Sequence, residues 1–277
     1  MTCIGRWLLI SLLIAGCRLA EESEAGVAGP DTPGTLPGEV TTGMVIRVND
    51  GDSLVVETRS GEVEVRLMGI NAPESYECYG QESERRLVEL VEGEQVGLEE
   101  VGRDQFGRTL AYLWLGDRLV NLEQVAGGLA IATTPEVGDV RGETLLESED
   151  QAYESGLGMW SDTVCGASGP PPSVDISGSV SSFDPPGPDD EVLGQEWVAL
   201  SSEEGVDLSG WTIRDESSVH RCLLPGEFSI VSGAERIVAS TDPCWDPGDS
   251  SVWNNGGDMA LLLDTAGRVV ARLRYPG

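Results

Sequence analysis

Alternating and apolar β-rich runs occupy the stretch from about residue 43 to residue 115, and they predict a series of short strands. The first two runs are joined by Asn49–Asp52 (NDGD), whose residue types favour a hairpin turn. Between the third and fourth runs, Leu87, Leu90 and Val91 recur at helical spacing and predict a helix over Gln81–Val91. The predicted strands are Gly43–Val48, Ser53–Thr58, Glu62–Ile70, Val96–Val101 and Thr109–Leu115.

Two further helices are predicted after the last of these strands, over Leu119–Ala126 and Glu143–Ser155. Five strands with a helix after the third are typical of a small Greek-key barrel of the OB type. We therefore expect an α+β domain over residues 43–165, built as a five-stranded OB-fold barrel with helices.

The region after residue 190 has a different pattern, with short β-rich runs at turn-like spacing and no convincing helix. Such spacing predicts an all-β domain, a β-sandwich over residues 191–277. The predicted strands are Glu196–Leu200, Trp211–Arg214, Phe228–Val231, Arg236–Ala239, Met259–Asp264 and Val269–Leu273.

Segments without hydrophobic periodicity flank these two domains. Residues 18–42 are rich in Glu, Gly, Pro and Thr and are typical of a flexible tether. Residues 166–190 contain PPP and DPPGPDD and predict a second linker. Residues 1–17 place Arg6 before a short apolar run, and they predict a signal peptide that is too short to span a bilayer comfortably.

The signal segment ends in Ile14-Ala15-Gly16-Cys17, which resembles a bacterial lipobox. The resemblance implies that cleavage leaves Cys17 as a lipidated N-terminus, with the membrane as a partner through the lipid anchor. An ordinary secretory signal with an incidental cysteine is the alternative. We therefore expect an exported protein, either a cell-envelope lipoprotein or a freely secreted one.

The charge is strongly acidic, with 48 acidic and 17 basic residues and a formal net charge of −31. Every basic residue is an arginine. Such a surface is soluble and repels polyanions at long range. Any nucleic-acid binding must therefore depend on local clusters and metal ions, and we expect a monomer.

Cysteine usage fits an exported protein, in which disulfides are plausible. Two of the six cysteines lie in the signal segment, and the remaining four allow more than one pairing. Because composition suggests a domain boundary between Cys165 and Cys222, we expect the local pairs Cys78–Cys165 and Cys222–Cys244. A four-cysteine zinc site lacks the CxxC spacing that such sites use.

The predicted barrel carries oxygen-bearing and basic side chains in distinctive settings. A hard divalent cation takes several oxygen ligands. Phosphodiester hydrolysis needs an oriented water, neutralised phosphate oxygens and a stabilised leaving group, and one cation, one carboxylate and two arginines can supply these. The alternative is that the acids are turn residues and that the arginine in the third strand pairs with a neighbour. The candidate set is Asp50, Asp52, Asn71, Glu74, Arg66 and Arg108.

Four stretches together are more specific than any one of these residues: NDGDSLVV, VRLMGINAPES, RDQFGRTLAYLWLGDRLVNLEQVAGGLA and GLGMWS. In this order and spacing they resemble the staphylococcal nuclease family over about Gly43–Cys165. The resemblance implies an OB-fold enzyme that cleaves DNA and RNA by a calcium-dependent endonucleolytic reaction and leaves 3′-phosphates. It also implies that Arg66 and Arg108 bind the scissile phosphate and that Glu74 is the general base or positions the attacking water.

Calcium ligands are implied at Asp52, Asn71 and the backbone carbonyl of Ala72, with Asp50 beside the metal as a helper. Asn71 stands where the family usually has a second calcium-binding Asp. It keeps an oxygen ligand but loses a charge, which predicts weaker calcium binding.

Positions that contact the nucleotide also differ from the family. Gln105 and Phe106 stand where the best-known members place Lys and Tyr, and Thr133 and Thr134 stand where those members have stacking tyrosines. These differences predict a weaker grip on the substrate.

The C-terminal stretches EWVALSSEEGVDLSGWTIRDESS and VWNNGGDMALLLDTAGRVV resemble a lamin-tail domain over roughly Glu191–Tyr275. The resemblance implies an immunoglobulin-like sandwich that binds or attaches to an unknown surface partner. We see no acid–base constellation within it.

The single histidine, His220, lies in the predicted sandwich. Its position excludes histidine-based nucleases, two-histidine phosphodiesterases and Ser-His-Asp hydrolases for the first domain. A carboxylate-based, metal-assisted mechanism remains. The alternative function is a non-catalytic surface lipoprotein whose degenerate barrel binds nucleic acid or another ligand.

Overall fold

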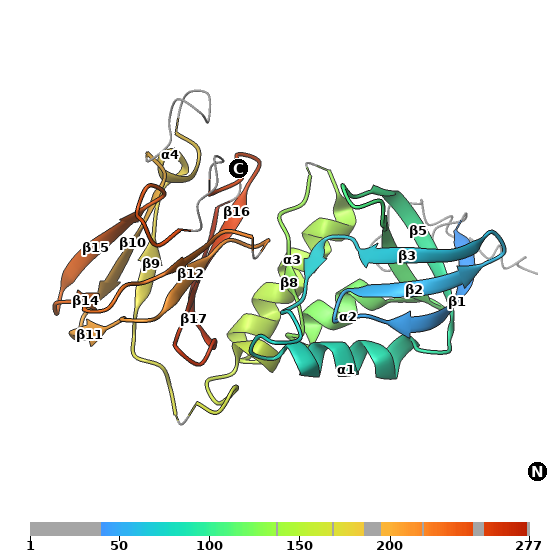
Figure 1. The fold of residues 1–277 in the computed structure, drawn as a ribbon, viewed down its shortest axis with the longest axis horizontal. Coiled ribbons are helices and arrows are strands. Elements are labelled where there is room, and N and C mark those ends of the chain that lie inside the picture. The colour runs from blue at the N-terminus through green and yellow to red at the C-terminus, as the bar shows by residue number, and fades with distance from the viewer. Residues whose placement is uncertain are drawn as a thin grey trace, which may run out of the picture.

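The computed structural model describes residues 40–136, 138–167, 169–185, 195–217, 219–245 and 252–275. The expected signal segment, Cys17 and residues 18–39 of the expected tether lie outside these residues. None of the helices described is long and apolar enough to cross a membrane. Figure 1 shows two β-rich parts side by side, with the longer helices on the N-terminal part.

The N-terminal part is a closed barrel. Its strands run in the order β3-β2-β1-β5-β6, and a parallel pairing of β3 with β6 closes the sheet. This five-stranded mixed barrel with helices fits the predicted OB fold. The strands are β1 (Thr41–Val48), β2 (Ser53–Thr58), β3 (Gly61–Leu67), β5 (Gln95–Arg103) and β6 (Thr109–Leu115).

Helices and short strands surround this barrel. Figure 1 shows the helices on the side of the barrel that faces the C-terminal part and below the strands. The helices are α1 (Gly80–Val91), α2 (Val120–Ala126) and α3 (Val140–Glu154), followed by the 3-10 turn η1 (Gly158–Trp160). The short strands are β4 (Ile70–Asn71), which pairs with β8 (Ile131–Ala132), and β7 (Arg118–Leu119), which pairs with β6.

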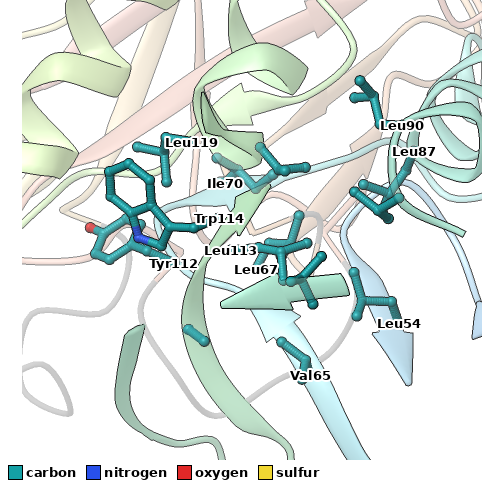
Figure 2. Close-up of a cluster of buried hydrophobic side chains, with 14 of the residues drawn as sticks. Leu54, Val65, Leu67, Ile70, Leu87, Leu90, Tyr112, Leu113, Trp114 and Leu119 are labelled. Atoms are coloured by element: carbon teal, nitrogen blue, oxygen red, sulfur yellow. The ribbon is translucent and has the colours of Figure 1, made fainter. Parts of the chain in front are cut away.

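The barrel core is filled from the strands and from one face of α1. Leu54, Val65, Leu87 and Leu113 are fully buried, and Figure 2 shows these side chains gathered in one cluster. Leu87 and Leu90 point inward because they lie at the helical spacing seen in the sequence. Each fully buried side chain of this kind stabilises the fold by about 1.5–3 kcal/mol relative to exposure.

The C-terminal part consists of further β-sheets, as its pattern predicts. One sheet has the order β15-β10-β9, a second has β13-β12-β16-β17, and β11 pairs with β14. The strands are β9 (Asp175–Ser177), β10 (Trp197–Ser202), β11 (Val206–Asp207), β12 (Thr212–Arg214), β13 (Arg221–Leu223), β14 (Ser229–Ile230), β15 (Ala234–Ala239), β16 (Asp258–Leu263) and β17 (Val269–Tyr275).

The linker prediction for residues 166–190 is wrong for part of that segment. Strand β9 pairs with β10, with Ile176 opposite Leu200. The short helix α4 (Val180–Phe183) follows, and Phe183 is buried against Trp253 and Tyr275. Two features of the sequence kept these elements from being predicted. The segment is rich in Pro and Ser, and β9 has only three residues, which is too short to show a clear periodicity. Residues 186–194, which include the end of the predicted linker, lie outside the description.

Both disulfides join residues within one part of the chain. Cys78 bonds to Cys165 and Cys222 bonds to Cys244, which are the two local pairings expected from the sequence. Cys222 is fully buried in the C-terminal core.

The two parts pack against each other through a shared apolar cluster. Charged groups surround it: the carboxylate of Glu149 on α3 is fully buried, and it pairs with Arg272 and Arg274 of β17. A buried carboxylate is tolerated only when such partners neutralise it. The barrel and the C-terminal sheet are therefore joined by apolar packing and by ion pairs that neutralise the buried Glu149. The apolar cluster consists of Ile131, Ala152, Met159 and Trp160 from the barrel side and Met259 and Leu261 from the C-terminal sheet.

Candidate functional site

The β1–β2 turn brings Asp50 and Asp52 to the end of the barrel. Asp50 Oδ1 accepts a hydrogen bond from the backbone N–H of Asp52 at 2.9 Å, which fixes the turn. Gly51 between them has no room for a side chain, because a Cβ there would lie 1.9 Å from Ser83 Oγ and 2.7 Å from Ala72 Cβ. The short Asp-Gly-Asp sequence is thus required by close packing of the turn against α1 and the segment after β4.

Asp52 lies at the centre of the site and is only 5% exposed. Its Oδ2 accepts a hydrogen bond from the backbone N–H of Ala72 at 2.6 Å and lies 3.1 Å from Arg66 Nη2. Its Oδ1 accepts a hydrogen bond from Ser53 Oγ at 3.0 Å. Burial raises the pKa of Asp52 to about 6, with the Arg66 cation opposing the shift and the Asp50 charge adding to it.

Arg66 is positioned by the β2–β3 hairpin, where it stands opposite Ser53. Its Nη1 donates to the carbonyls of Leu67 at 3.0 Å and Ile70 at 2.8 Å. Its Nη2 donates to Asn71 Oδ1 at 2.8 Å and contacts Asp52. The guanidinium therefore joins the end of β3, strand β4 and the β1–β2 turn.

Arg108 reaches the same place from the other edge of the barrel. The parallel pairing that closes the barrel sets Arg66 opposite Leu110, so the residue before β6 lies beside β3. Arg108 Nε donates to Asp104 Oδ2 at 2.7 Å, and Nη1 donates to Ser53 Oγ at 3.3 Å. Because Ser53 Oγ also bonds Asp52, the two arginines flank one carboxylate.

Glu74 stands apart from this network. It follows the turn after β4, its side chain is exposed, and its backbone N–H donates to Glu77 Oε2 at 2.8 Å. Among the residues described, none donates a hydrogen bond to the Glu74 carboxylate. Gly80 packs closely here, since a Cβ at Gly80 would lie 1.9 Å from the Glu74 carbonyl oxygen. The backbone of Glu74 is therefore closely packed against α1, while its carboxylate is exposed to water.

The oxygen donors of the site are of the type that a divalent cation binds. Asp52 Oδ2 and Asn71 Oδ1 both lie within 3.1 Å of one cationic nitrogen, Arg66 Nη2, so these oxygens already converge on a positive charge. Oxygen donors of this type suit calcium, which takes about six to eight of them. Among the described residues, however, no three Asp, Glu, His or Cys side chains gather as a metal site. The donors therefore fit a cation in type, and they would supply part of its coordination.

The structure thus brings together most of the residues singled out in the sequence. It also adds partners that the sequence analysis did not propose. Ser53 links Arg108 to Asp52, and its position next to Asp52 in the sequence is the local signal for it. Glu216 accepts a hydrogen bond from Asn71 Nδ2 through its backbone carbonyl at 3.0 Å, and it lies 145 residues away, so no local pattern indicates it. The residues in the connected network are Asp50, Asp52, Arg66, Asn71, Ala72 and Arg108.

Comparison with known proteins gives similarities over the barrel. The family model for staphylococcal nuclease homologues matches residues 64–162. An uncharacterized endonuclease of Haemophilus influenzae is 34% identical over 125 residues, which covers 45% of this chain and 68% of the relative. A thermonuclease of Staphylococcus intermedius is 30% identical over 125 residues, covering 42% of this chain and 74% of the relative.

A micrococcal nuclease of Shigella flexneri is 32% identical over 129 residues, covering 43% of this chain and 74% of the relative. The matched segment includes Arg66, Glu74 and Arg108. These relatives support a nuclease. On the similarity of the barrel, the chain belongs to the staphylococcal nuclease homologue family.

Proposed function

We propose that this protein is an exported, calcium-dependent endonuclease that hydrolyses phosphodiester bonds of DNA and RNA and leaves 3′-phosphates. The observation that carries the proposal is the arrangement of two guanidinium groups around Asp52: Arg66 contacts its carboxylate directly, and Arg108 is linked to it through Ser53 Oγ. Relatives that are thermonucleases suggest a metal-dependent reaction.

The two arginines would bind the phosphate that is attacked. A guanidinium presents several N–H donors in one plane and can contact two phosphate oxygens at once. Arg66 is held by two backbone carbonyls, so it approaches the phosphate with little freedom. Arg108 is about a third exposed, at 30%, and is aligned by Asp104. Preorganised donors of this kind stabilise the charge that develops on the phosphate oxygens.

Glu74 would accept the proton of the attacking water. The water oxygen forms a bond to phosphorus, the bond from phosphorus to the 5′-oxygen breaks, and the leaving oxygen takes up a proton. The exposed carboxylate can hold a water by hydrogen bonding before attack. The Glu74 carboxylate makes no hydrogen bond to the Arg66–Asp52 network among the described residues, although its charge also acts on the buried Arg214.

Asp52, Asn71 and the backbone carbonyl of Ala72 would hold the calcium ion, with Asp50 next to them. A bound calcium ion supplies positive charge to the phosphate oxygens. Asp50 already holds the turn that carries Asp52, so it positions that carboxylate whether or not a cation is present.

Digestion of DNA and RNA with calcium, with other divalent cations and with a chelator tests this proposal. We expect cutting with calcium only and a 5′-hydroxyl on the downstream product, detected by direct labelling with a polynucleotide kinase. Cutting that is unaffected by the chelator, or products that carry a 5′-phosphate, would contradict it.

A second candidate function is a non-catalytic binding module. One observation favours it: Arg66 Nη2 contacts both Asp52 and Asn71, so the oxygens proposed for calcium are already paired with a protein cation. Calorimetric titration with calcium distinguishes the two functions. No calcium binding at millimolar concentrations, together with retained binding to nucleic acid, would favour the binding module.

We further propose that Cys17 anchors the protein to a membrane and that the C-terminal sheets are a lamin-tail-like domain that attaches to a surface partner. The lipobox-like segment and the sequence resemblance support these proposals. Membrane fractionation of the full chain and of Cys17→Ser tests the anchor, and equal partition of both would contradict it.

A further inference from the structure

The side chain of Asn71 connects the nuclease site with the C-terminal part. Its Oδ1 accepts a hydrogen bond from Arg66 Nη2 at 2.8 Å, and its Nδ2 donates to the backbone carbonyl of Glu216 at 3.0 Å. Glu216 lies just after β12, in the connection to β13. A group outside the barrel therefore contacts a residue that we place among the metal ligands.

These two contacts allow only one orientation of the amide. If the amide were flipped, its NH₂ would face the N–H donors of Arg66 and its oxygen would face the Glu216 carbonyl oxygen. Both contacts would be repulsive. The Glu216 carbonyl thus ensures that the oxygen of Asn71 points toward Arg66 and Asp52.

The same contact explains why asparagine serves here better than aspartate. An aspartate has no N–H, so one carboxylate oxygen would face the Glu216 carbonyl oxygen across the distance that is now a 3.0 Å hydrogen bond. The half-buried setting would strengthen the repulsion, since nearby water is limited. An amide satisfies both neighbours, whereas a carboxylate satisfies only Arg66.

The Glu216 carbonyl is firmly held in position. The Glu216 carboxylate accepts hydrogen bonds from Thr134 N and Thr134 Oγ1, both at 2.9 Å, and lies 3.2 Å from Arg274 Nη1. Its backbone N–H donates to Asp258 Oδ1 at 3.1 Å. Glu216 is 6% exposed, so these contacts are buried and resist loop movement.

We infer that the C-terminal part completes the nuclease site, with Glu216 as a positioning residue that orients Asn71. The inference rests on the proposed function, because it gives Asn71 the role of a ligand. The C-terminal part would then have two roles: it would orient the Asn71 ligand in the barrel, and it would provide the proposed attachment. Substitutions in the connection after β12 should change metal binding although that connection supplies no ligand.

A double-variant cycle in the full chain tests the inference. The variants are Asn71→Asp, Glu216→Ala and the combination of both. Glu216→Ala removes the contacts to Thr134 and Arg274 and so loosens the segment that carries the carbonyl, although the bond from the backbone N–H of residue 216 to Asp258 remains. Glu216→Gln keeps an acceptor for Thr134 and serves as the conservative rescue. Glu203→Ala is the matched control, because that glutamate is exposed on the same part of the chain.

Two quantities are measured for every variant: calcium affinity by calorimetry, and thermal unfolding with chelator and without nucleic acid. We expect Asn71→Asp to lower the unfolding temperature in the wild-type background and to be tolerated in Glu216→Ala. The gain in calcium affinity that Asn71→Asp brings should be about tenfold larger in the Glu216→Ala background, as expected for residues in direct contact. Glu216→Gln, which loses the charge facing Arg274, should still give the wild-type response to Asn71→Asp, and Glu203→Ala should behave as wild type.

Equal effects of Asn71→Asp in both backgrounds would overturn the inference. If Glu216→Ala does not fold, NMR spectroscopy of the wild-type protein tests the inference instead. The side-chain amide protons of Asn71 should then be protected from exchange and lie close to residue 216, and rapid exchange would overturn the inference. The unfolding cycle needs neither calcium nor substrate, so its result stands even where the nuclease proposal fails.

Discussion

Replacement of Arg66 by alanine should destabilise the barrel as well as inactivate it. The guanidinium donates to Leu67 O, Ile70 O and Asn71 Oδ1, and it lies 3.1 Å from Asp52 Oδ2. The side chain of Asp52 is only 7% exposed, so loss of Arg66 would leave a buried carboxylate without its counter-charge. We therefore expect a large loss of folding free energy.

The expected magnitude follows from the burial of the pair. Breaking a buried ion pair by removing one partner costs about 3–5 kcal/mol. In a protein of this size, each kcal/mol lowers the unfolding temperature by about 2–4 °C, so a fall of roughly 6–20 °C is expected. Arg66→Lys should lose less, because the ammonium keeps the charge and loses only the planar set of donors.

Urea and thermal unfolding, monitored by circular dichroism, provide the measurement. Arg59→Ala is the control, since Arg59 lies exposed in the β2–β3 turn and should change the folding free energy by less than about 0.5 kcal/mol. An Arg66→Ala variant as stable as this control would refute the role of Arg66 as a buried counter-ion. Activity measured on an unfolded variant would carry no information about catalysis, so stability must be measured first.

Three further predictions concern separate regions. Glu74→Gln should lower the cleavage rate at least about a hundredfold with no change in unfolding temperature, because the side chain is exposed; a smaller loss would argue against a general base. Cys78→Ser should lower the free energy of unfolding by about 4–5 kcal/mol in the chain-entropy model for its 87-residue separation from Cys165, and urea unfolding measures this loss. Burial raises the pKa of Asp258 to about 6 from 3.8, with the nearby charge of Asp215 adding to the shift, so the folded state holds the proton more tightly. Stability should therefore fall as pH rises through about 4 to 6, and Asp258→Asn should flatten that change in urea titrations.

The strands of the barrel could be predicted well from sequence because each has a strong local pattern. Runs such as Ser53–Thr58 and Thr109–Leu115 have the same bounds in the structure as in the prediction. Several short elements were not predicted, among them β4, a two-residue strand at the end of the predicted third strand, and β9 within a Pro-rich segment. Strands of two or three residues have too little periodicity to be recognised.

Prediction of the site depended on family resemblance more than on local pattern. The approach of Arg108 to Arg66 follows from barrel closure by β3 and β6, which no short motif specifies. The contact of Asn71 with Glu216 was not predictable, since it joins the barrel to the C-terminal sheets across 145 residues of sequence. The sequence indicated a weakened calcium ligand at Asn71. The structure adds the backbone carbonyl of Glu216, which accepts a hydrogen bond that an amide can donate and a carboxylate cannot.

The most direct measurement of the central claim is cleavage of supercoiled plasmid by the purified full chain, with calcium and with a chelator, beside Arg108→Ala. Arg108 is partly exposed and its ion pair with Asp104 contributes little, about 0–1 kcal/mol, so this variant should stay folded. We expect cutting with calcium, none with the chelator, and a loss of at least about a hundredfold in the rate of the variant. Absence of calcium-dependent cutting, or equal rates for the variant and the wild type, would contradict it.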